Sequence, residues 1–424
     1  MKKKHIIFSI VTLVLLITFV TGFNYFKTTN TYVEDNIKNQ TKITKEISMN
    51  LEQTAGAGDY KTVTQSSWPT EGYKFNSELS RCENGSEISW DDTKKAVIVS
   101  GNLSDKCYVY FDKVFTLASY VISQYIGTQG DNGLYYHNSS LTNGAGDNSY
   151  RYAGANPNNF VCFGTNASPC PTDNLYRIIG LFGENYHGVS GKQLVKLIKY
   201  DYANSNLLGT DGDYKGSATP NATYYKGSLT SIDTYYWNND TVTNTWSESL
   251  LNKTNLNTNF INNIGSTWAE KIATTTWKVG GNIYANIRDV VPATAYQNEV
   301  VNPAPGSTST TGETTYSAKI GLMYASDYGF GVVPEAWTTT LYSYGGSMNS
   351  ATIRSQNWMY MGHYDWTISR NADLSSYAFD VNCDGLVTRI SVSSSTGVRA
   401  SFSLESSVSY VSGSGSMSDP VRIN

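Results

Sequence analysis

Charged residues are scarce in this chain, at 16% of its 424 residues, where soluble domains usually carry about 25%. Lys and Arg together number 31 against 35 Asp and Glu, which gives a formal net charge of −4. The cations beyond the first few residues are scattered. The chain therefore has no basic stripe of the kind that contacts a phosphate backbone, and we expect no nucleic-acid partner. Hydroxyl and amide side chains must supply the polar surface instead, a composition common in secreted, wall-associated proteins.

Histidine is also scarce, with 4 residues, and none of them stands in an H-E-x-x-H spacing. The sequence contains no G-x-S-x-G elbow and no Walker-type phosphate loop. Catalytic hypotheses therefore rest on isolated residues, either Cys383 with His363 as nucleophile and base, or Asp327 with Asp365 as the acid pair of a glycosidase. A half-buried thiol in a hairpin and acids that cap turns explain the same residues without catalysis.

The N-terminal segment predicts export from the cytoplasm. Lysines precede an uncharged apolar run at residues 6–23, which just reaches the length of a transmembrane helix, and this order of charge places the following chain outside. We expect a membrane anchor at residues 1–27, with the C-terminal region outside the cell membrane. Secretion after cleavage of a signal peptide is the alternative. Residues 28–58 are polar and poor in large apolar side chains, which predicts a stalk.

Short β runs separated by turns predict a small β module at residues 59–113. Cys82 and Cys107 bracket these runs, and so small a core benefits from a disulfide clamp outside the cell. Cys162 and Cys170 close a short loop further along the chain and predict a second bridge. Reduced thiols are the alternative for Cys82 and Cys107.

Residues 114–424 predict one large α+β domain. Its last third alternates apolar and polar residues by the strand rule, for example in the run from Val398 to Leu404. An Asn-Cys-Asp-Gly turn at 382–385 joins two of the expected strands. The same turn opens like a calcium loop, with Asp380, Asn382 and Asp384 at alternate positions. The twelfth position is a serine rather than an acid, so a β-turn is the better interpretation, and calcium is a weak alternative to no cofactor at all.

Several segments occur in an order that resembles a known family: DNSYRYAGANPNNFVCFG, LYRIIGLF, KIGLMYASDYG, WTISR, GVRASFSL and VSGSGSMSDPVRI. Together they resemble an uncharacterised domain family of Gram-positive bacterial surface proteins with a C-terminal Gly-Val-Arg-Pro signature. Ala400 stands where that family usually has proline. The pattern from Trp366 onward is similar to C-type-lectin-like folds, which implies a lectin-like antiparallel sheet in the large domain. Formylglycine-generating enzymes share that fold but need two site cysteines, and Cys383 is alone in this part of the chain.

Aromatic side chains crowd the segment before the expected C-terminal strands, and such side chains commonly anchor glycans and protein surfaces. We expect Tyr360, His363, Tyr364 and Asp365 to contact a glycan or a surface-protein ligand. The resulting hypothesis is a membrane-anchored extracellular binding or adhesion protein. A cell-wall or carbohydrate-active enzyme is the alternative, and a structural subunit of a surface assembly is the second alternative.

Overall fold

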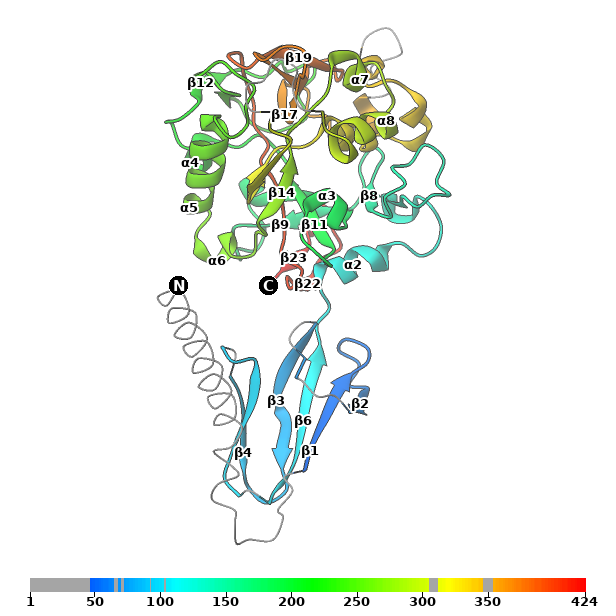
Figure 1. Ribbon diagram of the computed structural model, residues 1–424, viewed down its shortest axis with the longest axis vertical. Helices are drawn as coiled ribbons and strands as arrows, with labels where there is room; N and C mark the ends of the chain where they lie inside the picture. Colours follow the sequence, from blue (N-terminus) through cyan, green and yellow to red (C-terminus); the bar gives the residue numbers. More distant parts are fainter. Residues whose placement is uncertain are drawn as a thin grey trace, which may run out of the picture. The chain divides into compact units, whose positions relative to one another are not determined.

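The computed structural model describes residues 46–64, 68–69, 72–91, 93–102, 104–304, 312–345 and 354–424. The chain divides into two compact units, Met1–Val114 and Phe115–Asn424, called unit 1 and unit 2 below (Figure 1). Each unit is described by itself.

Unit 1 contains a four-stranded sheet in the order β2-β1-β6-β3, and a separate β4-β5 hairpin. β1 runs parallel to β6, while the other pairs are antiparallel. Alternate residues of the two central strands, Met49 and Leu51 of β1 and Val109 and Phe111 of β6, form its buried core, as the two-residue period of a strand requires. The strands of unit 1 are β1 (Glu46–Glu52), β2 (Tyr60–Val63), β3 (Tyr73–Cys82), β4 (Glu87–Asp91), β5 (Ala96–Ser100) and β6 (Lys106–Lys113).

The prediction of a stalk at residues 28–58 is wrong for residues 46–52. Glu46–Glu52 is a central strand of unit 1 rather than a solvated linker. The sequence of this strand does not show a clear apolar alternation, because only Met49 and Leu51 supply large buried apolar side chains. Asn50 and Glu52 are also buried, and their side chains form hydrogen bonds with the backbone of β6. Residues 28–45 lie outside the described residues.

Both expected disulfides are confirmed. Cys82 and Cys107 are directly opposite each other on β3 and β6, with Cα atoms 4.0 Å apart. Cys162 and Cys170 have Cα atoms 5.9 Å apart, and Cys383 is a free thiol. Two disulfides indicate an extracellular or secreted protein.

Unit 2 is built on an antiparallel sheet in the order β16-β21-β11-β10-β8-β7, with β9 also paired to β10. Every residue of β10 and β11 is buried. Side chains cover both faces of these strands, so their apolar runs do not alternate. The strands of this sheet are β7 (Leu134–Tyr136), β8 (Tyr150–Tyr152), β9 (Phe160–Cys162), β10 (Leu175–Phe182), β11 (Leu194–Lys199), β16 (Ile320–Gly321) and β21 (Ser401–Ser403).

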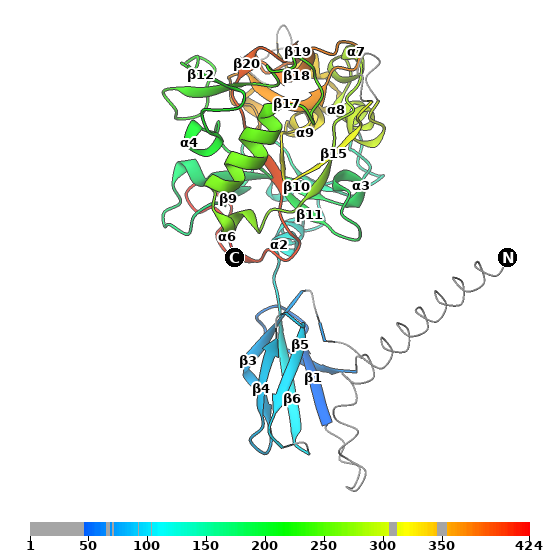
Figure 2. The same cartoon turned by 60° about the vertical axis from the view of Figure 1, so that its left-hand side comes forward.

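Four smaller sheets complete unit 2, and β17-β18-β19 lies at the end opposite α2 (Figures 1 and 2). Their strands are β12 (Tyr214–Ala218), β13 (Ile232–Tyr236) and β20 (Ser395–Thr396); β14 (Thr275–Lys278) and β15 (Thr315–Ala318); β17 (Asp365–Arg370), β18 (Tyr377–Val381) and β19 (Val387–Ser391); β22 (Tyr410–Ser412) and β23 (Arg422–Ile423). The expected hairpin is present, because β18 and β19 pair across the turn at 382–385.

The helices of unit 2 are short. The α-helices are α2 (Leu117–Gln124), α3 (Glu184–His187), α4 (Ser205–Leu208), α5 (Ile261–Asn263), α6 (Ser266–Ala269), α7 (Tyr284–Arg288), α8 (Pro292–Tyr296) and α9 (Ala325–Phe330). The π-helical segments are η3 (Leu251–Phe260) and η4 (Gln297–Val301), and the 3-10 turns are η1 (Asp131–Gly133), η2 (Thr172–Asn174), η5 (Pro334–Thr338) and η6 (Leu341–Tyr344). Thr116 caps α2 by accepting a hydrogen bond from the backbone N–H of Ser119.

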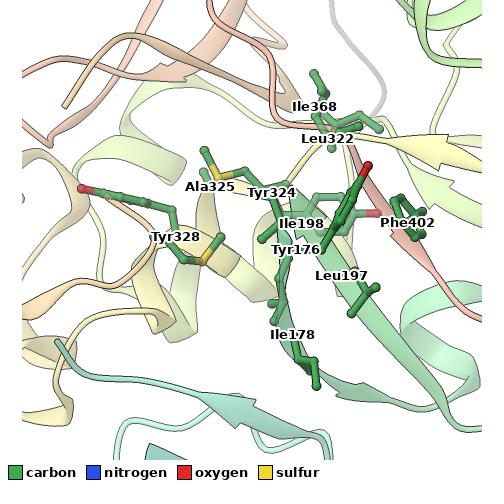
Figure 3. Packing of buried hydrophobic residues seen from close by; sticks show 14 of the residues in the cluster. Tyr176, Ile178, Leu197, Ile198, Leu322, Tyr324, Ala325, Tyr328, Ile368 and Phe402 are labelled. Carbon is green, nitrogen blue, oxygen red and sulfur yellow. The ribbon is translucent and has the colours of Figure 1, made fainter. Parts of the chain in front are cut away.

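One large hydrophobic core holds these elements together. Figure 3 shows side chains of β10 and β11, such as Ile178 and Leu197, beside Tyr324 and Tyr328 at α9 and Phe402 of β21. Each fully buried side chain of this size contributes about 1.5–3 kcal/mol of transfer free energy. The core therefore fixes α9 and the last strands against the sheet.

The expected fold class needs correction. No helix within the described residues combines the length and the apolar character needed to cross a bilayer. The run at residues 6–23 lies outside those residues, so the expected transmembrane helix is not supported. The C-terminal strands also do not form one lectin-like sheet, since β17-β18-β19 is separate while β21 joins the sheet of β10 and β11. Mixed sheets with few, short helices describe the fold.

Candidate functional site: a cationic pocket lined by aromatic side chains

A pocket of about 250 Å³ opens in unit 2 between β9, β10 and the segment at residues 357–361. We call it the Arg177 pocket. Pockets for drug-sized ligands measure about 300–1,000 Å³, so this one suits a group of monosaccharide size. Two cations and four aromatic rings supply most of its large lining side chains: Arg177, Lys226, Phe160, Tyr200, Trp358 and Tyr360.

Arg177 is held by neutral partners alone. It sits on β10, only 5% exposed. Its Nε donates to Asn159 Oδ1 at 2.7 Å, and its Nη2 donates to the carbonyl of Pro157 at 2.9 Å and to Asn156 Oδ1 at 3.3 Å. The carbonyl of Trp358 accepts a longer bond of 3.5 Å from Nη1. These contacts orient the guanidinium without neutralising its charge.

Two aromatic faces sandwich the same guanidinium. Its carbon lies 4.3 Å from the ring centre of Phe160 and 4.6 Å from that of Trp358, a cation–π geometry that offsets part of the cost of burial. Burial still lowers the pKa of Arg177 to about 9, and the positive charge of Arg399 contributes to the lowering. A guanidinium in this state gains more than a solvated one from an added anion, because little water screens the interaction.

Lys226 brings a second cation to the rim. Its backbone N–H donates to the carbonyl of Met361 at 3.0 Å, which docks the 224–226 loop onto the 357–361 segment. Its Nζ donates to the carbonyl of Arg354 and lies 4.9 Å from the ring centre of Tyr360. Burial, followed by the charges of Arg354 and Arg177, lowers the pKa of Lys226 to about 8.

No acid offsets these charges within the described part of the chain, where none of the ion pairs includes Arg177 or Lys226. No Asp or Glu lines the pocket either. Cationic donors and aromatic rings together line this pocket. A carboxylate can bridge the two cations by accepting from the remaining N–H of Arg177 Nη1 and from Lys226 Nζ.

The four expected ligand residues are separated by the structure. Tyr360 lines the Arg177 pocket and donates its hydroxyl to the carbonyl of Cys383. His363 is half-buried against the ring of Tyr202, and Tyr364 is 37% exposed. Asp365 is buried on β17, where its Oδ2 accepts a 2.6 Å bond from Arg399 Nε. Only Tyr360 therefore takes part in the pocket, and Asp365 is a structural ion pair.

The weak calcium alternative gains no support from the geometry. Asp380 points from β18 into the interior with both carboxylate oxygens buried and without hydrogen-bond partners. Asn382 uses its side-chain oxygen to accept the backbone N–H groups of Asp384 and Leu386, which is an Asx turn. No group of three His, Cys, Asp or Glu side chains in the described ranges is placed to hold a metal ion.

The geometry also gives no support to the two catalytic alternatives, an acid pair and a cysteine nucleophile. Asp327 is buried and bonded to Lys196, and Asp365 is bonded to Arg399, so neither is a free acid in a cleft. Burial raises the pKa of the Cys383 thiol, which disfavours the nucleophilic thiolate.

A separate pocket of about 560 Å³ carries Asp147 and Glu184. Although desolvation opposes ionisation, Arg151 and the hydrogen bonds from Ser149 and Tyr296 dominate and lower the pKa of Asp147 to about 2. That carboxylate cannot donate a proton near neutral pH.

Sequence reasoning missed both cations of the site. Arg177 lies within the run LYRIIGLF, which predicts an ordinary buried strand. The available signal was the arginine itself, since a charged residue in the middle of a fully buried strand requires partners. Lys226 lies in a loop between β12 and β13, and nothing in its local sequence marks it.

Comparison with known proteins adds no relative: no family model, no curated protein and no solved structure matches this chain. The resemblance to the Gram-positive surface family, and to C-type-lectin-like folds, stays a prediction.

Proposed function

We propose that this chain is an extracellular binding protein whose unit 2 captures an acidic sugar of a surface glycan in the Arg177 pocket. The single observation that carries the proposal is Arg177, a buried guanidinium with only neutral partners beside an open, aromatic-lined pocket. A sugar ring can contact the parts of Trp358 and Tyr360 that line the pocket while its carboxylate meets Arg177 and Lys226.

A surface protein presenting a carboxylate is the other ligand class compatible with this chemistry. The aromatic lining of the pocket favours a sugar ring over the aliphatic stem of an acidic protein side chain. The proposal therefore commits to a glycan.

A glycan array tests the proposal directly. The probe is the chain from residue 46 onward, which contains the strands of unit 1 and all of unit 2, applied to matched acidic and neutral saccharides. We expect retention on glucuronate- or sialate-terminated glycans and none on the neutral counterparts. Equal retention on both sets, or none on either, would refute it.

The two alternatives have weaker support. The carbohydrate-active enzyme needs a carboxylic acid with a raised pKa in a cleft, and the pocket with Asp147 and Glu184 provides an ionised Asp147 instead. The structural subunit needs a long unpaired edge strand or a large apolar patch. The edge strands of the main sheet, β16 and β7, have two and three residues, whereas β3 at the edge of the unit 1 sheet has ten and is the feature that favours this alternative.

A further inference from the structure

Lys196 and Asp327 meet in the interior of unit 2, away from the Arg177 pocket. Lys196 lies on β11 and Asp327 on α9. The distance between Nζ and Oδ2 is 2.7 Å, and the two side chains are 1% and 0% exposed. The hydroxyl of Tyr186 contacts both partners, 2.6 Å from Nζ and 2.7 Å from Asp327 Oδ1. An amine and a carboxyl group are thus held in contact, with a hydroxyl positioned to pass a proton between them.

The surroundings exclude water, and this desolvation disfavours the charged form of the Lys196 amine. Aromatic rings enclose Nζ, with ring centres at 4.4 Å for Tyr324, 4.8 Å for Tyr186 and 5.0 Å for Trp277. Burial lowers the pKa of Lys196. An unprotonated lysine in a dry site is a nucleophile. Contact enforced by the fold can supply effective concentrations of about 10⁵–10⁸ M.

The nearby charges remain balanced if this pair is neutralised. Arg151 has its own counter-ion, since its Nη2 lies 2.7 Å from Asp147 Oδ2. Its contact with Asp327 is longer, 3.6 Å from Nη1, and that Nη1 makes no hydrogen bond. Glu299, in the same interior, has its pKa raised to about 8 by burial, so it is mainly neutral at pH 7. Removing the charges of Lys196 and Asp327 therefore leaves no unpaired ion among these five groups.

We propose that Lys196 and Asp327 condense into an intramolecular amide that covalently joins β11 to α9. A proton first passes from Nζ to the carboxylate of Asp327, which gives a neutral amine and a neutral acid. The Nζ lone pair then attacks Cγ and forms the C–N bond. The C–O bond breaks, and the carboxyl oxygen leaves with two protons as water. No oxidant, cofactor or metal is required, and the net change is the loss of one water molecule.

This cross-link would span two partners 131 residues apart in sequence. It would tie β11 to α9 across a long loop. As with a disulfide across a long loop, this would reduce the conformational entropy of the unfolded chain and so stabilise the fold. Unlike a disulfide, it would resist reduction. Such a link suits an extracellular protein, and it does not depend on the proposed glycan ligand.

Mass spectrometry of the full chain tests the proposal after denaturation, reduction and tryptic digestion. We expect peptide 193–199, uncleaved after Lys196, to be joined to peptide 320–354, with the combined mass lower by one water. Recovery of 193–196 and 320–354 as separate peptides of full mass, with no joined species, would overturn the proposal and leave an ordinary buried ion pair.

Two variants locate the link. Lys196→Met removes the nucleophile and should abolish the joined peptide. Lys199→Met alters the next buried lysine of β11, whose Nζ donates to the carbonyl of Asp173, and should retain the joined species. If Lys196→Met fails to fold, the wild-type peptide map still decides. A water-loss link that persists in Lys196→Met would overturn the assignment.

Discussion

At the scale of single residues, Arg177 explains why unit 2 is suited to an anion. Burying a cation costs several kcal/mol unless it is paired and hydrogen-bonded. Four neutral acceptors and two aromatic faces reduce that cost without cancelling the charge. An incoming carboxylate supplies the missing partner, and each charge-assisted hydrogen bond contributes about 1.5–3 kcal/mol.

The pKa of Lys226 gives the site a pH dependence. Because this pKa is about 8, Lys226 carries its charge below that pH and loses it as the pH rises through it, while a sugar carboxylate stays ionised. We expect affinity for glucuronate to be constant from pH 6 to 7 and to fall by more than about tenfold by pH 9.5, because Arg177, whose pKa is about 9, also loses charge in that range. Calorimetric titration across this range measures it. An affinity that rises with pH would contradict the assignment.

Residue-level prediction from sequence was uneven for a physical reason. Tyr360 was expected at a ligand site and does line the pocket. Asp365 was expected there too, but its partner Arg399 lies on a different part of the chain and draws it into the interior. The sequence does not predict a binding role for Arg177. The pocket beside it forms only when tertiary packing brings Trp358 and Phe160 against its guanidinium.

At the scale of elements, the close packing of two loops shapes the rim of the pocket. Gly362 has a φ of +82°, and a Cβ there would overlap the carbonyl of Tyr224. The 224–226 loop can therefore approach the 357–362 segment only because residue 362 is glycine. This approach allows Lys226 to bond to Met361.

Gly362→Ala should consequently be destabilising. The left-handed φ costs about 1–2 kcal/mol for a residue with a Cβ, and steric overlap adds about 1–3 kcal/mol. We expect a loss of about 2–5 kcal/mol in the free energy of unfolding, measured by denaturant titration. Gly183→Ala is the matched control, because Gly183 has a φ of −88° and open space around it, and should cost less than about 1 kcal/mol. Equal losses in both variants would refute the packing argument.

Local elements were predictable where local sequence determines them. The hairpin of β18 and β19 follows from its alternating strands and Asn-Cys-Asp-Gly turn, and both are present. The run from Val398 to Leu404 alternates as expected, yet its polar face is buried as well. Ser401 donates to the carbonyl of Leu197 there, so alternation alone did not reveal that β21 is a central strand.

At the scale of the whole molecule, the pairing of distant strands was beyond sequence reasoning. β21 lies between β11 and β16, which places Phe402 opposite both Leu197 and Ile320. Hydrophobic pattern gives each strand but not its neighbours, because register depends on packing across the whole core. The stalk was misjudged for the same reason, since β1 is stabilised by pairing with β6, far along the chain.

The two disulfides should differ in their effect on the two units. Cys82–Cys107 spans 25 residues and Cys162–Cys170 spans 8, and the stabilisation grows with loop length. We expect the double change Cys82→Ser and Cys107→Ser to lower the unfolding free energy of unit 1 by about 3 kcal/mol, a large share for so small a core. Thermal unfolding followed by calorimetry should then show an earlier transition for unit 1 alone.

The matched control is the pair Cys162→Ser and Cys170→Ser, which should leave the transition of unit 1 unchanged and cost unit 2 about 2 kcal/mol. A loss confined to unit 2 in the first variant would contradict the assignment of Cys82–Cys107 as the clamp of unit 1.

The most direct test of the central claim is calorimetric titration of the chain from residue 46 onward with glucuronate and with glucose at pH 7, in the wild type, Lys226→Met and Lys215→Met. Lys226 contributes to the Arg177 pocket, while Lys215 is an exposed lysine on β12 beside Tyr236. We predict saturable binding of glucuronate and not of glucose, weakened about tenfold in Lys226→Met and by less than about twofold in Lys215→Met. Binding of both sugars alike, or equal affinity for glucuronate in all three proteins, would contradict the account.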